Sequence, residues 1–183
     1  MMFDWYSSVE HFLPNAYDFL RAQGAKVTWD RMVWEPWSMP RYNFILWLTV
    51  LGRIKTKDRL HFASINAFCV FCRQEDETHA HLFFSRAWTS SLWGEIKSWL
   101  RINRRMSIIV SAIRGLSPRG RNKEAKMRRV SLGLTIYLIW VERNKRLFDN
   151  CSVSVEMIFH KFQVMFYTIF HFYDQNHLDL QVG

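Results

Sequence analysis

The chain has 183 residues, of which 49% are hydrophobic and 16% aromatic, a composition that indicates a folded protein and excludes an intrinsically disordered one. Its net charge of +9 equals the excess within residues 101–129, where ten Lys and Arg residues stand against a single acid, Glu124. The three cysteines are a close pair and a separate Cys151, which excludes a disulfide framework and indicates a reducing compartment, the nucleus or the cytoplasm.

The N-terminal half is predicted to be helical, because the whole chain has only seven glycines and four prolines to interrupt helices. Residues 7–22 have the spacing of an amphipathic helix, and residues 27–34 hold short aromatic and β-branched pieces that fit either a strand or an extended segment. Residues 40–52 should form a second helix with Pro40 in its first turn, and Thr56 should cap a third. One apolar face of the second helix is formed by Phe44, Trp47, Leu48 and Leu51.

The C-terminal half is predicted to contain four more helices, at residues 87–102, 107–116, 123–148 and 153–174. Residues 132–141 are apolar on every side, so the middle of the 123–148 helix must be buried. The 153–174 helix should pack against it. The predicted fold class is mostly α, a compact multi-helix domain with a short Cys/His loop and a C-terminal pair of long helices.

No membrane or secretion signal is evident. The apolar run at residues 132–141 is shorter than the about 20 residues that a membrane-spanning helix needs. The first residues lack the basic and apolar regions of a signal peptide. We therefore expect a protein that is not secreted and that has no transmembrane helix.

Residues 69–86 have the spacing of a compact zinc knuckle. Cys69 and Cys72 are separated by two residues, and His81 follows nine positions later. A structural zinc ion takes four nitrogen or sulfur ligands, and a Cys-x-x-Cys turn commonly supplies two of them. A redox dithiol is the alternative, but no βαβ pattern surrounds the pair.

An ordered set of motifs extends around this loop. It consists of Trp34, Pro40–Leu48, Arg53–Leu60, Cys69-x-x-Cys72, Glu77-Thr78, His81–Phe84, Leu92-Trp93 and Tyr137-x-x-Trp140-x-Glu142-Arg143-Asn144. The set resembles the zinc-binding domain that follows the reverse transcriptase in plant retrotransposons lacking long terminal repeats, the LINE type. The resemblance runs from about residue 15 to 150.

The resemblance implies Cys69, Cys72 and His81 as zinc ligands, together with a cysteine five positions after that histidine. Arg86 stands at this last position, and a guanidinium has no lone pair to offer a metal. His79 is the first candidate for the fourth ligand. The acids Glu75, Asp76 and Glu77, or a water molecule, are weaker candidates. Tight zinc, weak zinc with three ligands and no metal all remain open.

The resemblance and the charge pattern together divide the chain into four parts. These are an N-terminal helix at 1–25, the zinc-binding-like domain at 26–102, a basic linker region at 103–122 and a two-helix extension at 123–183 that packs on the domain.

A concentrated basic segment favours a polyanion, RNA or DNA, as partner, although a solvated helix face with a basic loop is the alternative. The candidate phosphate contacts are Arg101, Arg104, Arg105, Arg119, Arg121, Lys123, Lys126, Arg128 and Arg129.

No catalytic motif is found. Two-metal polymerase chemistry needs paired aspartates, and the sequence has no Asp-Asp pair, no Gly-x-x-x-x-Gly-Lys loop and no Gly-x-Ser-x-Gly elbow. We expect a non-catalytic fragment that binds nucleic acid, with RNA as the favoured class. The alternatives are a degenerate retroelement remnant with no selected activity and a protein-interaction module that uses some of the nine tryptophans.

Overall fold

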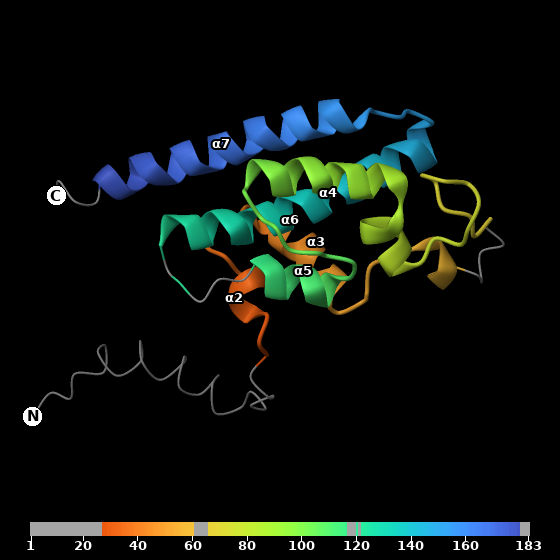
Figure 1. Cartoon of the computed structure of the whole chain (residues 1–183), viewed down its shortest axis with the longest axis horizontal. Coiled ribbons are helices and arrows are strands. Elements are labelled where there is room, and N and C mark those ends of the chain that lie inside the picture. The colour runs from red at the N-terminus through yellow and green to blue at the C-terminus, as the bar shows by residue number, and fades with distance from the viewer. Residues whose placement is uncertain (1–26, 61–65, 117–119, 121, 180–183) are drawn as a thin grey trace, which may run out of the picture.

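The computed structural model of the protein describes residues 27–60, 66–116, 120 and 122–179, and this part is built from helices without a strand. The fold class predicted from the sequence is therefore confirmed (Figure 1). The α-helices are α2 (Asp30–Val33), α3 (Pro40–Val50), α4 (Ala87–Trp99), α5 (Ile109–Leu116), α6 (Lys123–Asn144) and α7 (Val155–Asp179). Shorter helical turns are η1 (Lys57–Arg59), η3 (His81–Ser85) and η4 (Lys145–Asp149).

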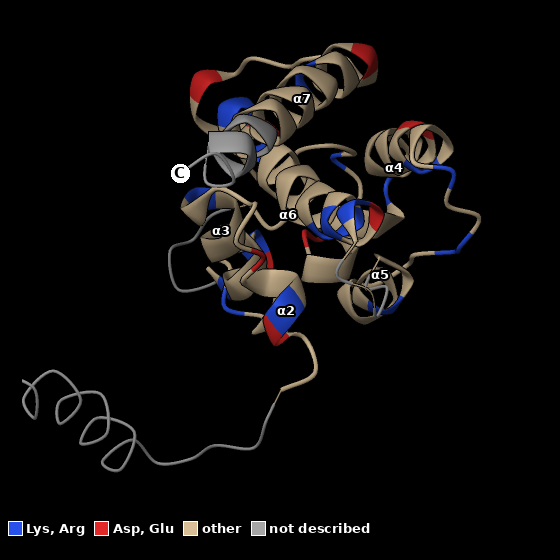
Figure 2. Ribbon diagram, turned by 90° about the vertical axis from the view of Figure 1, so that its left-hand side faces the viewer, with Lys and Arg blue, Asp and Glu red and all other residues tan. Residues whose placement is uncertain are grey.

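Helix α6 is the centre of the fold. It contacts α2, α3, α5 and α7, which surround it when the molecule is viewed nearly along the helix (Figure 2). Its middle turns are buried on all sides, including the polar Ser131 and Thr135, whose hydroxyls donate to backbone carbonyls of the same helix. The apolar run at residues 132–141 therefore forms the centre of the core. None of the described helices has the length and apolarity of a membrane span.

Helix α7 closes the core from one side. It packs on α6, as predicted, and also on α4. Phe162 and Phe166 of α7 are buried, and Trp99 at the end of α4 meets them edge-on, with ring centroids 5.8 and 5.1 Å away. The other tryptophans of α4 have different partners, since Trp88 stacks on Phe71 and Trp93 stacks on Phe84.

Two expectations for the N-terminal half are corrected. Part of the 27–34 segment is the short helix α2 and not a strand, because the Trp29 carbonyl accepts from the N–H groups of Met32 and Val33. Directly after Thr56 the described residues form the 3₁₀ turn η1, and the Thr56 hydroxyl makes no capping bond there. The helix predicted at 7–22 and residues 61–65 lie outside the described residues.

The apolar face noted for α3 in the sequence is only partly buried, with Trp47 and Leu48 packed against the core. Phe44 and Leu51 are 50% and 37% exposed, whereas Tyr42 and Leu46 are buried. The 42/46 face of α3 packs on α6 at Gly133, where an added Cβ atom would lie at ordinary contact distance, 3.7 Å from the Tyr42 Cβ and 3.8 Å from a Leu46 methyl.

Candidate metal centre

The loop before η3 is folded as a tight turn around the cysteine pair. The Cys69 N–H donates to the Glu75 carbonyl at 2.8 Å, and the Cys69 carbonyl accepts from the Arg73 N–H at 2.8 Å. Arg73 has a left-handed φ of 56°, and an isolated antiparallel bridge joins Phe68 to Asp76 at the base of the turn. Backbone geometry of this kind is uncommon for a non-glycine residue and persists where the surrounding structure enforces it.

His81 is presented to the same place by the π-helical turn η3. The turn begins after Thr78, whose hydroxyl and carbonyl accept from the N–H groups of His81 and Leu82. Leu82 and Phe83 are fully buried, so η3 is anchored in the core. His81 itself is 6% exposed, and Cys69 is 0% exposed.

The structure brings three of the predicted ligands together. The Sγ atoms of Cys69 and Cys72 and a ring nitrogen of His81 all lie within 4.8 Å of one another. The Cys72 Sγ and the His81 Nε2 are 3.3 Å apart. A tetrahedral zinc ion with bonds of 2.0–2.3 Å separates its ligand atoms by about 3.3–3.8 Å. The three residues therefore fit a zinc ion, whose presence stays a prediction.

The electrostatics favour the metal-binding forms of Cys72 and His81. Desolvation opposes ionisation of Cys72, but backbone N–H groups of Gln74 and Glu75 and the nearby guanidinium of Arg86 outweigh it and lower the pKa of this thiol. Burial, followed by the same guanidinium, lowers the pKa of His81 and keeps its imidazole neutral. Burial raises the pKa of the Cys69 thiol. A metal ligand must be a thiolate or a neutral imidazole, so two of the three groups are already biased toward the binding form.

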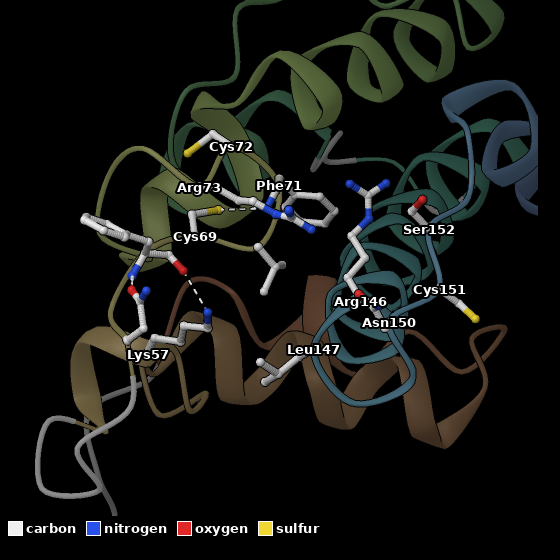
Figure 3. Close-up of a pocket in the computed structure, with 13 residues that line it drawn as sticks. Lys57, Cys69, Phe71, Cys72, Arg73, Arg146, Leu147, Asn150, Cys151 and Ser152 are labelled. Carbon is white, nitrogen blue, oxygen red and sulfur yellow. Dashed lines mark hydrogen bonds between the residues drawn. The ribbon is translucent and has the colours of Figure 1, made fainter.

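His79 is not part of this group. Its ring lies against Phe83 with centroids 5.2 Å apart, and burial lowers its pKa. Because the ring faces the core, His79 does not take the place left by the missing cysteine in this structure. Cys151 does not take it either, since its sulfur points away from Cys69 and Cys72 across the neighbouring pocket (Figure 3).

Arg86 and Glu75 form the rim of the site. The Arg86 guanidinium contacts both Glu75 oxygens, at 2.8 and 3.4 Å. The Glu75 Oε2 is also 3.3 Å from the His81 Nδ1. Arg86, at the position where the resemblance implies a cysteine, lies close enough to Cys72 to lower the pKa of its thiol. Sequence reasoning did not identify its contact with Glu75, because the two are eleven residues apart and both are of types common on surfaces.

A buried ion pair holds the loop against α6. The Glu77 Oε1 accepts from the Arg143 Nε and Nη2 at 3.0 and 2.7 Å, and from the Lys57 N–H at 3.1 Å. The Glu77 and Arg143 side chains are 0% and 3% exposed. Two of the motifs in the sequence, Glu77-Thr78 and Glu142-Arg143-Asn144, are brought into contact by this pair, although Glu77 and Arg143 are 66 residues apart in the sequence.

A pocket of about 540 Å³ lies between the loop and η4 (Figure 3). Phe71 lines one wall, and behind it the ring stacks on Trp88, with ring centroids 4.7 Å apart and planes at 9°. The Arg146 guanidinium covers both rings at 4.7 and 5.1 Å and is bound by the Glu142 carboxylate. This arginine is therefore held in place as part of the wall.

The predicted phosphate contacts are distributed unevenly. Arg101, Arg104 and Arg105 are exposed after α4, and Lys123 is exposed at the start of α6. Arg119 and Arg121 lie outside the described residues. Arg128 pairs with Glu124 at 2.6 Å, and the Lys126 ammonium lies 4.0 Å from the Trp37 ring centroid.

Arg129 requires a correction. Its guanidinium is 2.5 Å from the Glu35 Oε2, and both side chains are buried, so this charge is neutralised in the core and does not face a polyanion. Sequence reasoning missed this pairing because Glu35 lies 94 residues earlier in the chain.

The comparisons with known proteins agree with this geometry. Residues 12–93 match a protein-family model described as zinc-binding in reverse transcriptase. No curated protein and no solved structure matches the chain. The match contains all three grouped residues, and it supports the resemblance at the level of a reverse-transcriptase zinc-binding domain. The plant and LINE-type assignment stays a prediction.

Proposed function

We propose that the protein is a retroelement-derived zinc-binding module that binds nucleic acid, single-stranded RNA in particular, and that has no catalytic activity of its own. The family match to residues 12–93 and the Cys69, Cys72 and His81 group support the first part. In this role the three residues would hold a zinc ion that supplies structural cross-linking of the loop. The RNA-binding surface is a separate feature of the chain.

The single observation that carries RNA binding is a cationic groove beside the C-terminal end of α4. The groove has a volume of about 510 Å³, and Lys97, Arg104 and Arg105 line it. Among the described residues, no carboxylate forms an ion pair with any of these three cations. Cations without acidic partners and lining a concave surface are well suited to bind a phosphate backbone.

A second, smaller pocket with aromatic lining also involves the end of α4. It has a volume of about 290 Å³ and is lined by Trp99, Arg101, Glu124, Arg128 and Tyr167, among others. The Tyr167 side chain is 61% exposed, and its ring meets Trp99 edge-on at 5.7 Å. A base stacked on an exposed aromatic ring next to cations typically contributes about 1–3 kcal/mol to single-strand binding.

The test is fluorescence anisotropy with a labelled single-stranded RNA over a series of salt concentrations. The groove variant Lys97→Gln/Arg104→Gln/Arg105→Gln is compared with a control, Arg31→Gln/Arg53→Gln/Lys55→Gln, which removes the same charge from exposed positions elsewhere. If the three groove cations each contact a phosphate, the slope of log K against log salt falls by about 2 for the groove variant only. Absence of binding at about 50 mM salt, or equal weakening by both variants, would refute the proposal.

A second candidate function is protein interaction, and an exposed aromatic cluster favours it. Trp34 and Phe44 are 51% and 50% exposed, and their rings lie 6.2 and 5.9 Å from the ring of Trp47. Exposed apolar patches commonly mark contact surfaces. Two results together would favour this function: the wild type does not bind RNA, and it self-associates in a way that Trp34→Ser/Phe44→Ser abolishes. A failure to detect the protein in tissue would instead favour the degenerate remnant.

A further inference from the structure

His81 has two distinct ring contacts. Its Nε2 faces Cys72 at 3.3 Å, and its Nδ1 faces the Glu75 carboxylate at 3.3 Å. The carboxylate is an acceptor only, so the proton of a neutral His81 ring is placed on Nδ1 and the Nε2 lone pair is directed at the cysteines. This is the arrangement in which a metal-ligating histidine is oriented by a carboxylate behind it.

Arg86 fixes the carboxylate in turn. Its Nη2 donates to the Glu75 Oε2 at 2.8 Å, the same oxygen that faces His81, and the Arg86 side chain is only 17% exposed. A guanidinium that contacts both oxygens defines the plane of the carboxylate as well as its position. The residue that replaces the missing cysteine therefore has a defined structural role.

We infer that Glu75, held by Arg86, is the positioning residue of a three-ligand Cys₂His zinc centre whose fourth coordination position is left to an exogenous donor such as water or imidazole. The inference rests on the zinc-binding part of the proposed function. Within the described residues, no carboxylate or further histidine joins the Cys69, Cys72 and His81 group, so Glu75 acts on the ring and not on the metal.

Charge balance supports the same arrangement. Two thiolates, a neutral imidazole and a divalent cation sum to zero, and the pair of Glu75 and Arg86 also sums to zero. A cysteine at position 86 would replace one positive charge by a thiolate and leave Glu75 without its partner, for a net charge of −2, of which the charge on the 61% exposed Glu75 is screened by solvent. The low net charge lowers the cost of burying the three-ligand centre.

The test is zinc affinity of the purified full chain, measured by competition with a chromophoric chelator. Removing an outer-shell carboxylate typically weakens metal binding 10–100-fold, so we expect a loss of that size for Glu75→Ala and a smaller loss for Glu75→Gln, whose amide oxygen still accepts from Nδ1. Arg86→Ala should weaken binding and Arg86→Lys should restore part of it. Glu124→Ala is the matched control, because it removes an exposed carboxylate that also pairs with an arginine, and it should leave the affinity unchanged.

Cobalt spectroscopy tests the fourth position. We expect imidazole to change the d–d absorption bands of the Co²⁺-loaded wild type, whereas Arg86→Cys should bind metal more tightly and be insensitive to imidazole. Circular dichroism of the metal-free variants checks that each is folded as the wild type is.

The outcomes separate the two claims. Wild-type zinc binding that Glu75→Ala and Glu75→Gln leave unchanged would overturn the positioning role and preserve the zinc module. If imidazole does not change the d–d bands of the Co²⁺-loaded wild type, the claim of an exchangeable fourth position is overturned. A wild type that binds no zinc would overturn the inference and the zinc part of the proposed function together, while RNA binding by the α4 groove is measured independently.

Discussion

The buried pair of Glu77 and Arg143 gives the sharpest stability prediction. We consider Arg143→Met, which removes the guanidinium but keeps a flexible apolar side chain of similar length. The Glu77 carboxylate would then keep the Lys57 N–H as a donor to Oε1. Its Oε2 already has no hydrogen-bond partner among the described residues, so the carboxylate would be a nearly uncompensated buried charge.

The expected magnitude follows from this environment. Removing one member of a buried ion pair typically costs about 3–5 kcal/mol, because the remaining charge stays in a poorly solvated position. For a chain of this size, each kcal/mol shifts the melting temperature by about 2–4 °C, so we expect a fall of about 6–20 °C. The double variant Glu77→Leu/Arg143→Met should cost less than the single one, because no buried charge remains. It still leaves the Lys57 N–H without an acceptor, which costs about 1–3 kcal/mol.

The assay is urea unfolding followed by circular dichroism in the presence of a chelator, so that metal binding does not contribute to the free energy of unfolding. Arg128→Met is the control, because its partner Glu124 is 66% exposed and an exposed i,i+4 pair contributes only about 0.3–0.5 kcal/mol. A loss of less than about 1 kcal/mol for Arg143→Met, at an unchanged m value, would show that the pair does not hold the loop to α6.

Three further changes have defined effects on the free energy of unfolding in the same assay. Gly133→Ala should stabilise the protein by up to about 1 kcal/mol, because alanine favours the helix and the added Cβ comes no closer than 3.7 Å to a neighbouring atom. A loss of stability would mean that α3 and α6 cannot accommodate a methyl group. Trp93→Phe should cost about 1–3 kcal/mol, since the buried Phe83 carbonyl loses the indole N–H that donates at 2.8 Å, and a neutral result would mean that another donor replaces it. Asn122→Ala should cost about 1 kcal/mol, because the Asn122 side chain accepts from the Ala125 N–H at the start of α6, whereas Asn122→Asp should retain the cap.

Helices with strong local signals were predictable from the sequence. Pro40 marks the start of α3, and the all-round apolar stretch of α6 identified the central helix. The core face of α3 was not predictable, because two apolar faces compete and the choice depends on packing against α6, a helix far along the chain. Short helices such as α2 depend on a few backbone bonds, which leave no periodic pattern in a sequence.

The candidate site shows the same division between local and long-range information. The spacing of Cys69, Cys72 and His81 is local, and it identified the three residues that the fold brings together. The contact of Arg86 with Glu75 and the burial of Arg129 against Glu35 are pairings across 11 and 94 residues. In both cases the sequence shows a charged residue but not its partner, so the fate of the charge was not predictable.

The long helix and the metal loop depend on each other energetically. The family match ends at residue 93, yet the partners of Glu35 and Glu77 are Arg129 and Arg143, which both belong to α6. A chain that ended after the matched segment would lose both counter-charges together with the central helix on which Glu35 and Glu77 are buried. The contact of Glu77 with Arg143 is one of those that hold the loop with the cysteine pair against α6. The loop geometry required for zinc is therefore set by α6 as much as by the knuckle spacing, and a fragment intended to bind metal must extend at least through Arg143.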